Sequence, residues 1–483
     1  MGFMALVQRA RDQMPSNALP SHVFREYDIR GKAYDDIDLT FCYWLGSAFG
    51  EKVRAGGCEK VVVGRDNRHS SPDFHRALIC GLQEAGCQVV DIGEVSTPMF
   101  YFALEHLRIP DGIMITASHN PGGENGFKIA MNYSTIYGEA IQKLRRSMRM
   151  RMEKLDAPAH FRWSASRLKR VDIDTAYLDM LKEKITFGPR KLKVVADCGN
   201  GTPSPFVPRA LRNWGCEVVE LYCQSDPDFP NHHPDPVDPA NLRDLIDKVR
   251  EEKADLGIAF DGDGDRLGVV DEQGNVLWGD QLMILFWREI LPRYPGCTAL
   301  IEVKCSQALV EEVKRLGGKP VFHRTGHSHI KASMKKMNVP FSGEMSGHLF
   351  FRDEYYGFDD ALYAAGRLLR ILSHTGRPLS ALFADVPRYF STPETRVPCA
   401  DDAKQRVMSK IKQFFQGKRE TIDVDGVRVL FPHGWGLIRC SNTQPILVLR
   451  AEADTEAGLG EIKSELMKAL HSCSGGLQVN VNW

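Results

Sequence analysis

The stretch Glu59–Arg68 (EKVVVGRDNR) decides the fold class, because an apolar strand ends there in a polar turn. An amphipathic helix is predicted near 75–86, and a second strand follows at 87–93 (CQVVDIG). The same scheme returns at 191–222 and again at 298–326. Strands that alternate with helices favour parallel sheets flanked by helices, with functional sites at the carboxyl ends of the strands. The sequence therefore predicts three related α/β units, whose helices are capped by Gly86, Gly215 and Gly317.

The last hundred residues follow another pattern. Hairpin strands are predicted within 421–440 (TIDVDGVRVLFPHGWGLIRC), a further strand at 445–454, and a helix at 456–472. This order is typical of a smaller α+β domain with an antiparallel sheet. Joints rich in proline and polar residues suggest a leader at 1–22 and four domains at 23–168, 169–275, 276–387 and 388–483.

Composition narrows the class of protein. The 483 residues are 43% hydrophobic and carry a formal net charge of zero, which argues against a broad surface for nucleic acid or membrane. The sequence contains no run of eighteen apolar residues, so no membrane span is predicted, and the first residues lack the features of a secretory signal. The twelve cysteines are scattered and are interpreted as reduced thiols. We expect a cytoplasmic protein that acts on small molecules, with its oligomeric state left open.

An acidic segment, Asp261–Arg266 (DGDGDR), follows an apolar strand. Its three aspartates alternate with glycines, so all three carboxylates can turn toward one hard cation such as Mg²⁺ or Ca²⁺. A solvated acidic turn is the weaker interpretation, because three adjacent like charges repel one another. An EF-hand is rejected because Arg266 stands where that loop needs glycine, and the preceding segment resembles a strand.

A second candidate segment is the turn 116–121 (TASHNP), at the end of an apolar strand. Ser118 is expected to be exposed at the carboxyl end of that strand, as a nucleophile or phosphoryl carrier. Spacing alone favours a plain turn serine that caps a backbone amide. The G-x-S-x-G elbow of serine hydrolases is absent.

Two further turns carry polar groups of less specific meaning. Residues 343–348 (GEMSGH) could grip the hydroxyls of a polyol or be a surface loop, and residues 439–445 (RCSNTQP) could hold an anion or form an Asx turn. His323, His327 and His329 do not complete a zinc set, and His327 is the better candidate for an active-site imidazole.

Together and in this order, these segments resemble the α-D-phosphohexomutase superfamily, most closely its bacterial phosphomannomutase/phosphoglucomutase branch. The resemblance runs from about Phe24 to the C-terminus. It rests on YDIRG (27–31), TASHNP (116–121), NGFK (125–128), DGDGDR (261–266), VKCS (303–306), TGHSHIK (325–331), GEMSGH (343–348) and RCSNTQP (439–445). The resemblance implies three related α/β domains with mixed sheets and a C-terminal α+β domain like the TATA-binding protein, around a central cleft.

The resemblance also implies roles for individual residues. Ser118 would be the phosphoserine, and Mg²⁺ would be held by Asp261, Asp263, Asp265 and a phosphate oxygen on Ser118. The reacting groups would include His119, Lys128, His327, Arg266 and Arg30, with Lys128 and His327 as proton-transfer candidates. The substrate would be bound by Tyr27, Lys304, His327, Glu344, Met345, Ser346, Gly347, His348, Arg439, Ser441, Asn442 and Thr443.

The activity implied is the interconversion of hexose 1-phosphate and hexose 6-phosphate, with mannose or glucose as the sugar. It would proceed through a hexose 1,6-bisphosphate, which also serves as activator. A phosphoglucosamine mutase is the alternative, followed by a Mg²⁺-dependent sugar-phosphate phosphohydrolase. A catalytically silent paralogue is disfavoured because the serine and all three aspartates are intact.

Overall fold

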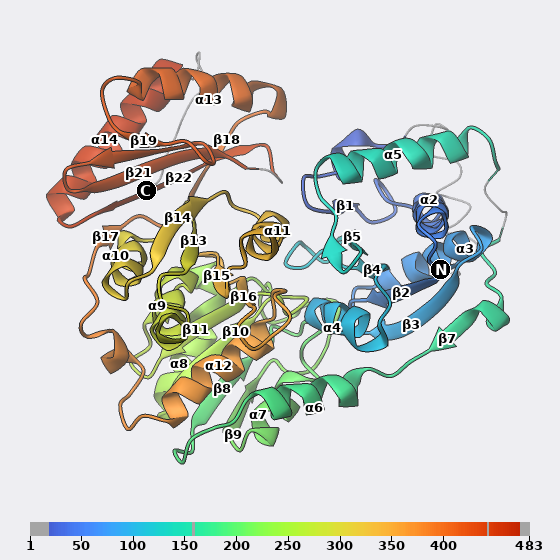
Figure 1. Ribbon diagram of the computed structural model, residues 1–483, viewed down its shortest axis with the longest axis horizontal. Helices are drawn as coiled ribbons and strands as arrows, with labels where there is room; N and C mark the ends of the chain where they lie inside the picture. Colours follow the sequence, from blue (N-terminus) through green and yellow to red (C-terminus); the bar gives the residue numbers. More distant parts are fainter. Residues whose placement is uncertain (1–18, 157–159, 442–443, 474–483) are drawn as a thin grey trace. The chain divides into compact units, whose positions relative to one another are not determined.

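The computed structural model describes residues 19–156, 160–441 and 444–473. The chain forms two compact units. The first extends to Leu277 and also includes the later segment Phe358–Ser380. The second comprises Trp278–Gly357 and the chain from Ala381 onward. Figure 1 labels the elements of both. In the described part of the chain, no helix is both long and apolar enough to span a membrane.

The first unit contains a sheet of seven strands. Its order is β1 (Ile29–Lys32), β5 (Glu124–Met131), β4 (Gly112–Ile115), β2 (Lys60–Arg65), β3 (Gln88–Glu94) and β7 (Leu168–Arg170), and β6 (Ser134–Thr135) pairs with β5. Its helices are α2 (Leu39–Ala55), α3 (Ser71–Glu84), α4 (Thr97–Leu107) and α5 (Glu139–Met152).

Helices α2 and α3 pack unusually closely. A Cβ atom at Gly81 would lie 2.0 Å from the Tyr43 carbonyl oxygen, so only glycine permits this approach. On the sheet, the Phe127 ring of β5 stacks on Phe41 from α2 and on Phe74 from α3, with ring centroids 6.3 Å and 6.4 Å apart. This aromatic core fixes β5, and with it the loop that joins β4 to β5.

A second sheet in the same unit has five strands. Its order is β12 (Val276–Leu277), β11 (Leu267–Asp271), β10 (Leu256–Phe260), β8 (Lys193–Asp197) and β9 (Glu217–Leu221). The helices α6 (Asp174–Lys184), α7 (Val207–Asn213) and α8 (Arg243–Glu252) accompany it. The later helix α12 (Ala361–Ser373) packs against β11, so the segment predicted at 276–387 contributes a helix to the first unit.

The second unit contains the two remaining sheets. One has the order β14 (Lys319–His323), β13 (Thr298–Glu302), β15 (Phe341–Gly343) and β16 (Leu349–Phe351), with helices α9 (Gly279–Ile290), α10 (Gln307–Arg315) and α11 (His327–Met337). The other is antiparallel, with β17 (Phe390–Ser391), β22 (Ile446–Ala453), β21 (Gly434–Cys440), β20 (Val427–Phe431) and β19 (Thr421–Ile422) in order, and β18 (Thr395–Pro398) also on β22. Its helices are α13 (Asp401–Phe415) and α14 (Glu456–Cys473). Short 3-10 turns occur at η1 (Ser21–Val23), η2 (Ala165–Arg167), η3 (Pro239–Leu242), η4 (Leu291–Arg293) and η5 (Ser380–Phe383).

The first three sheets share one topology, which confirms the predicted repeat. Their strand orders β3-β2-β4-β5, β9-β8-β10-β11 and β14-β13-β15-β16 are equivalent. In each, three parallel strands are followed by a fourth that is antiparallel to the third. The sequence pattern predicted parallel sheets, and this is correct for the first three strands of each sheet but not for the fourth. The family resemblance implied mixed sheets, and the structure has them. The turns 116–121, 261–266 and 344–348 all lie in the same place, between the third and fourth strands.

Local details agree with the sequence as well. Gly86, Gly215 and Gly317 follow their helices with φ of 88°, 87° and 80°, as predicted for left-handed caps. All twelve cysteines are free thiols. Residues 1–18 of the predicted leader lie outside the described residues.

Candidate active site

Ser118 occupies a constrained turn between β4 and β5. Its φ is 55°, in the left-handed region that costs a serine free energy, and its amide N–H donates to Thr116 Oγ1 at 2.9 Å. The expectation that Ser118 would be exposed was wrong, since only 2% of the residue is accessible. The reason is long-range packing: the 261–266 loop and the guanidinium of Arg68 lie against the turn.

Arg68, which the sequence reasoning did not single out, holds this turn in place. The side chain is buried and pairs with Asp66 at 3.1 Å. Its terminal nitrogens donate to the carbonyl oxygens of Ser118 at 2.8 Å and of Asn120 at 2.6 Å. They also donate to the carbonyls of Pro121 and Glu124, at 2.6 and 3.0 Å. One side chain therefore satisfies four backbone acceptors of the serine turn.

The first aspartate of the acidic loop faces the serine directly. The Ser118 hydroxyl donates to Asp261 Oδ2 at 2.8 Å, while Asp261 Oδ1 accepts the amide N–H groups of Asp265 and Arg266 at 3.0 and 3.1 Å. A Cβ atom at Gly262 would lie 2.5 Å from the Ser118 carbonyl oxygen. Glycine at 262 is therefore what allows the two loops to approach so closely.

The second aspartate binds cationic and hydroxyl groups of the neighbouring sheet. Asp263 Oδ2 accepts from Lys128 Nζ at 2.6 Å and from Thr97 Oγ1 at 2.5 Å. Lys128 Nζ also pairs with Asp265. The ammonium group of Lys128, on β5, is thus held by two of the three aspartates, and all three aspartates are buried.

Burial and mutual repulsion set the protonation of this cluster. Burial, together with the Asp265 and Asp263 charges, raises the pKa of Asp261 well above its usual range. Burial alone would also raise the pKa of Asp263, but the charge of Lys128 outweighs this effect, so the pKa of Asp263 is lowered. Burial alone would lower the pKa of Lys128, yet the Asp263 and Asp265 carboxylates raise it well above its ordinary value. The amine of Lys128 is accordingly a cation in this arrangement.

The triplet meets the chemical requirements of a small divalent cation. Asp261, Asp263 and Asp265 each offer a carboxylate oxygen, and these oxygens lie within 4.8 Å of one another. In the described residues, Asp263 Oδ1 is buried without a hydrogen-bond partner, which is costly for a carboxylate unless a cation approaches it. An all-oxygen donor set suits Mg²⁺ or Ca²⁺.

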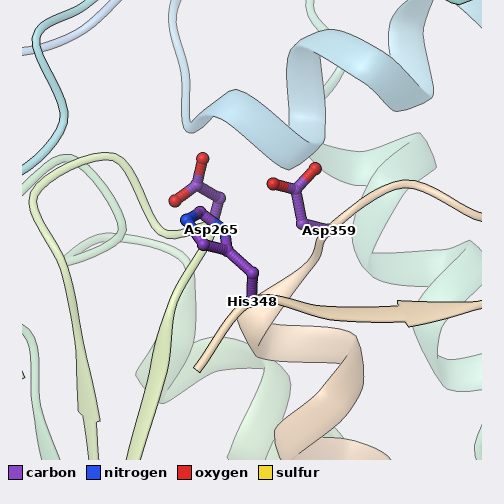
Figure 2. A group of neighbouring side chains, drawn as sticks. All are labelled: Asp265, His348 and Asp359. Atoms are coloured by element: carbon purple, nitrogen blue, oxygen red, sulfur yellow. The ribbon is translucent and has the colours of Figure 1, made fainter. Parts of the chain in front are cut away.

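Asp359, just before α12, is another buried acid that sequence reasoning missed. Oxygens of Asp359 and Asp265 lie within 4.8 Å of each other, and Figure 2 shows the two carboxylates side by side. The only hint in the sequence is the pair Asp359-Asp360 ahead of an apolar helix, where Asp360 is the helix cap. The distance of 94 residues along the chain gives no signal that Asp359 reaches the acidic loop.

Other predicted groups of the first unit gather around the serine. His119 Nδ1 lies 3.1 Å from Ser118 Oγ. Arg30 Nη1 donates to the Ala117 carbonyl at 3.2 Å and to Asn120 Oδ1 at 2.9 Å. The structure therefore brings His119 and Arg30 to the Ser118 turn.

Two further predicted residues of this unit are less directly placed. Arg266 Nη1 lies 3.7 Å from Asp235 Oδ1, so its side chain also pairs with an acid outside the triplet. Tyr27 is buried near the amino end of the unit.

The predicted sugar-binding turn of the second unit is internally ordered. Glu344 Oε1 accepts the Gly326 amide N–H at 2.6 Å, which ties 343–348 to the turn that precedes His327. The His327 and His348 rings stack with centroids 5.5 Å apart. Met345 Sδ contacts the guanidinium of Arg450, a residue that sequence reasoning did not select. Of the remaining members, Ser346 is partly exposed and Gly347 has a φ of 91°.

The predicted anion-binding turn lies in the same unit. Arg439 Nε donates to Asp425 Oδ2 at 2.9 Å, and Ser441 Oγ accepts the Gln444 amide N–H at 3.1 Å. Lys304 Nζ pairs with Glu394 at 2.9 Å. Asn442 and Thr443, also predicted here, lie outside the described residues.

In the first unit, a buried serine hydroxyl lies beside an acidic cluster that fits a divalent cation, an arrangement suited to phosphoryl transfer. Models of phosphoglucomutase/phosphomannomutase α/β/α domains I, II and III match residues 21–154, 175–274 and 278–390, and that of the C-terminal domain matches 394–469. The chain belongs to the phosphoglucomutase/phosphomannomutase family, whose members are isomerases that interconvert hexose 1- and 6-phosphates.

Individual relatives agree over almost the whole length. A phosphomannomutase/phosphoglucomutase of Pseudomonas aeruginosa PAO1 is 44% identical over 462 residues, which cover 95% of this chain and 98% of the relative. A phosphoglucomutase of Neisseria gonorrhoeae is 40% identical, covering 93% and 97%. The crystal structure of a family protein from Burkholderia thailandensis superposes with a TM-score of 0.87 at 40% identity, covering 96% and 100%.

Proposed function

We propose that Ser118 carries the transferable phosphoryl group and delivers it to the free hydroxyl of a hexose monophosphate. The observation that carries this proposal is the 2.8 Å hydrogen bond from Ser118 Oγ to Asp261 Oδ2. It supports a reaction in which the serine oxygen lies against the acidic cluster. The left-handed backbone at Ser118 adds support, because such strain is retained where the surrounding structure enforces it for function.

Asp261, Asp263 and Asp265 would hold Mg²⁺, with a phosphate oxygen on Ser118 as the further ligand. The ion would supply positive charge to the transferring phosphoryl group. The unpartnered, buried Asp263 Oδ1 supports this assignment among the described residues.

Positive side chains would stabilise the remaining charge of the transferring group. Lys128 is held as a cation beside Asp263, and Arg30 is anchored on the Ser118 turn. Arg266 would contribute from the acidic loop. Charge placed in advance around a phosphoryl group is the main source of catalysis in such reactions.

A base must accept the proton of the attacking sugar hydroxyl. His327 and Lys128 are the two proposed proton-transfer groups, and His119, at 3.1 Å from Ser118 Oγ, would orient the serine oxygen. The variant His327→Asn distinguishes these two candidates for the base. If His327 is the base, the variant should lose turnover but keep the phosphate on Ser118.

The second half of the reaction returns a phosphoryl group to Ser118. The hexose 1,6-bisphosphate formed in the first half would reorient and present its other phosphate, and the same compound added from solution would load an unphosphorylated serine. Glu344, Met345, Ser346, Gly347 and His348 would bind sugar hydroxyls with Lys304 and Tyr27. The non-reacting phosphate would be held by Arg439, Ser441, Asn442 and Thr443.

Mannose and glucose phosphates are the proposed substrates, since a turn that reads hydroxyls common to both sugars would accept either. The names of the Pseudomonas and Neisseria relatives support this choice. Rates with mannose, glucose and glucosamine 1-phosphates would test it, and a clear preference for glucosamine would overturn it. We further propose that the protein works in the cytoplasm on free sugar phosphates.

The mechanism is tested with Ser118→Ala. The variant should fold and lose nearly all mutase activity. It should also fail to gain a phosphoryl group when incubated with glucose 1,6-bisphosphate. Steady release of inorganic phosphate by the parent, at the rate of isomerisation, would instead favour a phosphohydrolase.

A further inference from the structure

Two cysteines at the end of the second sheet lie in contact. Cys198 directly follows β8 and Cys223 lies two residues beyond β9, and these neighbouring parallel strands pair Asp197 with Leu221. Their Sγ atoms are 3.4 Å apart and both are free thiols. Adjacent strands lie about 4.8 Å apart, within the Cα separation of roughly 4.4–6.8 Å that a disulfide spans.

We propose that Cys198 and Cys223 form a reversible disulfide in the presence of a low-molecular-weight disulfide, and that this bond lowers mutase activity. The sulfur atoms need to approach by only about 1.4 Å to reach the bonded distance of ~2.0 Å.

The two thiols differ in a way that orders the reaction. Cys198 is buried, and burial raises the pKa of its thiol well above the ordinary value. Cys223 is partly exposed, so it is the thiol that a dissolved oxidant reaches first.

The chemistry balances with oxidised glutathione as oxidant. The Cys223 thiolate attacks one sulfur of the glutathione disulfide, whose S–S bond breaks and releases one glutathione as a thiol. The Cys198 thiolate then attacks Cys223 Sγ, which forms the protein disulfide and releases the second glutathione. Two protein thiols are oxidised, one external disulfide is reduced to two thiols, and the two protons pass to the departing thiolates.

The turn after Cys198 connects the bond to the active site. The Thr202 amide N–H donates to the Gly262 carbonyl at 2.9 Å, and a Cβ atom at Gly201 would lie 2.9 Å from the same oxygen. The Asn200 carbonyl accepts from Asn67 Nδ2 at 3.0 Å. Asn67 immediately precedes Arg68, which holds the Ser118 turn.

This tight packing leaves little room for the turn to move. When Cys198 is drawn toward Cys223, the displacement passes to the loop around Gly262 and to the Asn67 side chain. A misplacement of about 1 Å near reacting groups costs up to ~100-fold in rate. We therefore expect oxidation to lower the turnover by about tenfold or more.

The test treats fully reduced, full-length protein with oxidised glutathione, followed by intact mass and tryptic mapping. The expected product has lost two hydrogens and contains a cross-link between peptides 194–209 and 213–243, at Cys198 and Cys223. Turnover of glucose 1-phosphate should fall in proportion to this product and return with dithiothreitol. Cys223→Ser should keep its turnover under the same treatment, and the partly exposed Cys297→Ser should respond like the parent.

The outcomes are decisive in either direction. A parent that keeps all its thiols, or one that forms a disulfide elsewhere, overturns the proposal. So does a Cys198–Cys223 bond that leaves turnover unchanged. Circular dichroism of Cys223→Ser verifies that its resistance comes from the missing thiol in a folded protein.

Discussion

The Arg68 guanidinium donates to the Ser118 carbonyl oxygen at 2.8 Å and, through its other contacts, fixes the turn from Ser118 to Glu124. The planar, permanently charged guanidinium offers five N–H donors in a fixed arrangement, so it can donate to several carbonyls at once. The position of the Ser118 hydroxyl thus depends on a side chain 50 residues earlier in the chain.

Arg68→Met should therefore lower turnover by about 100-fold, because the serine turn loses its buried donors. Arg68→Lys should recover only a small part, since one ammonium cannot reach all four acceptors. Steady-state kinetics with glucose 1-phosphate measures the effect. Arg76→Met, which removes an exposed arginine of α3, is the matched control. Parental turnover in Arg68→Met would contradict the assigned role.

Gly262→Ala should reduce turnover at least tenfold. The new methyl group would lie 2.5 Å from the Ser118 carbonyl oxygen, so one of the two loops must move away. Gly123→Ala, in the same serine loop but with no atom within 4 Å of its Cβ position, should behave like the parent. Equal kinetics for both variants would show that the close approach of the loops is unimportant.

Asp263→Asn should weaken Mg²⁺ binding by more than about tenfold, because it removes one charge from the triplet and disturbs its Lys128 pair. Isothermal calorimetry on the unphosphorylated protein measures the affinity. Asp228→Asn removes an exposed carboxylate and serves as control. An unchanged isotherm for Asp263→Asn would remove this residue from the metal site.

The pair of His232 and Asp197 should make stability depend on pH. Burial lowers the pKa of His232, but the Asp197 carboxylate at 3.0 Å outweighs it, so the pKa is raised. Because the pKa of His232 is higher in the folded protein than its value of about 6.5 in the unfolded chain, the pair stabilises the fold at pH values below 6.5. This stabilisation is lost as the pH rises through the pKa of the folded protein.

Urea unfolding of the parent and of His232→Gln measures this contribution. The difference in unfolding free energy should be larger at pH 6 than at pH 9. The exposed His69, which pairs with Asp228, provides the control variant His69→Gln with little change at either pH. A difference that grows toward pH 9 would reverse the sign assigned to His232.

Much of the fold could be predicted because its signals are local. Each repeated unit shows an apolar strand, an amphipathic helix and a capping glycine such as Gly86, all within about 35 residues. The direction of the fourth strand could not be predicted, because β5 and β11 carry no pattern that distinguishes parallel from antiparallel pairing. Because that strand runs back along the third one, the turns 116–121, 261–266 and 344–348 are short connections at the carboxyl end of the third strand.

The grouping of side chains around Ser118 could be predicted only in part. The three aspartates were singled out because they alternate with glycines, whereas the spacing around Ser118 favoured a plain turn serine and only the family resemblance gave it a role. Arg68 and Asp359 escaped because their contacts join segments far apart in the chain. The burial of Ser118 has the same origin, since the loop that covers it begins 143 residues later.

The central claim is that Ser118 carries the phosphoryl group, and its most direct test is transfer from labelled enzyme. Protein loaded with [³²P]phosphate from labelled glucose 1,6-bisphosphate should carry the label on the peptide that contains Ser118. On addition of unlabelled glucose 1-phosphate, the label should appear in hexose bisphosphate in a single turnover. Label on another residue, or label on Ser118 that does not transfer to sugar, would contradict the account.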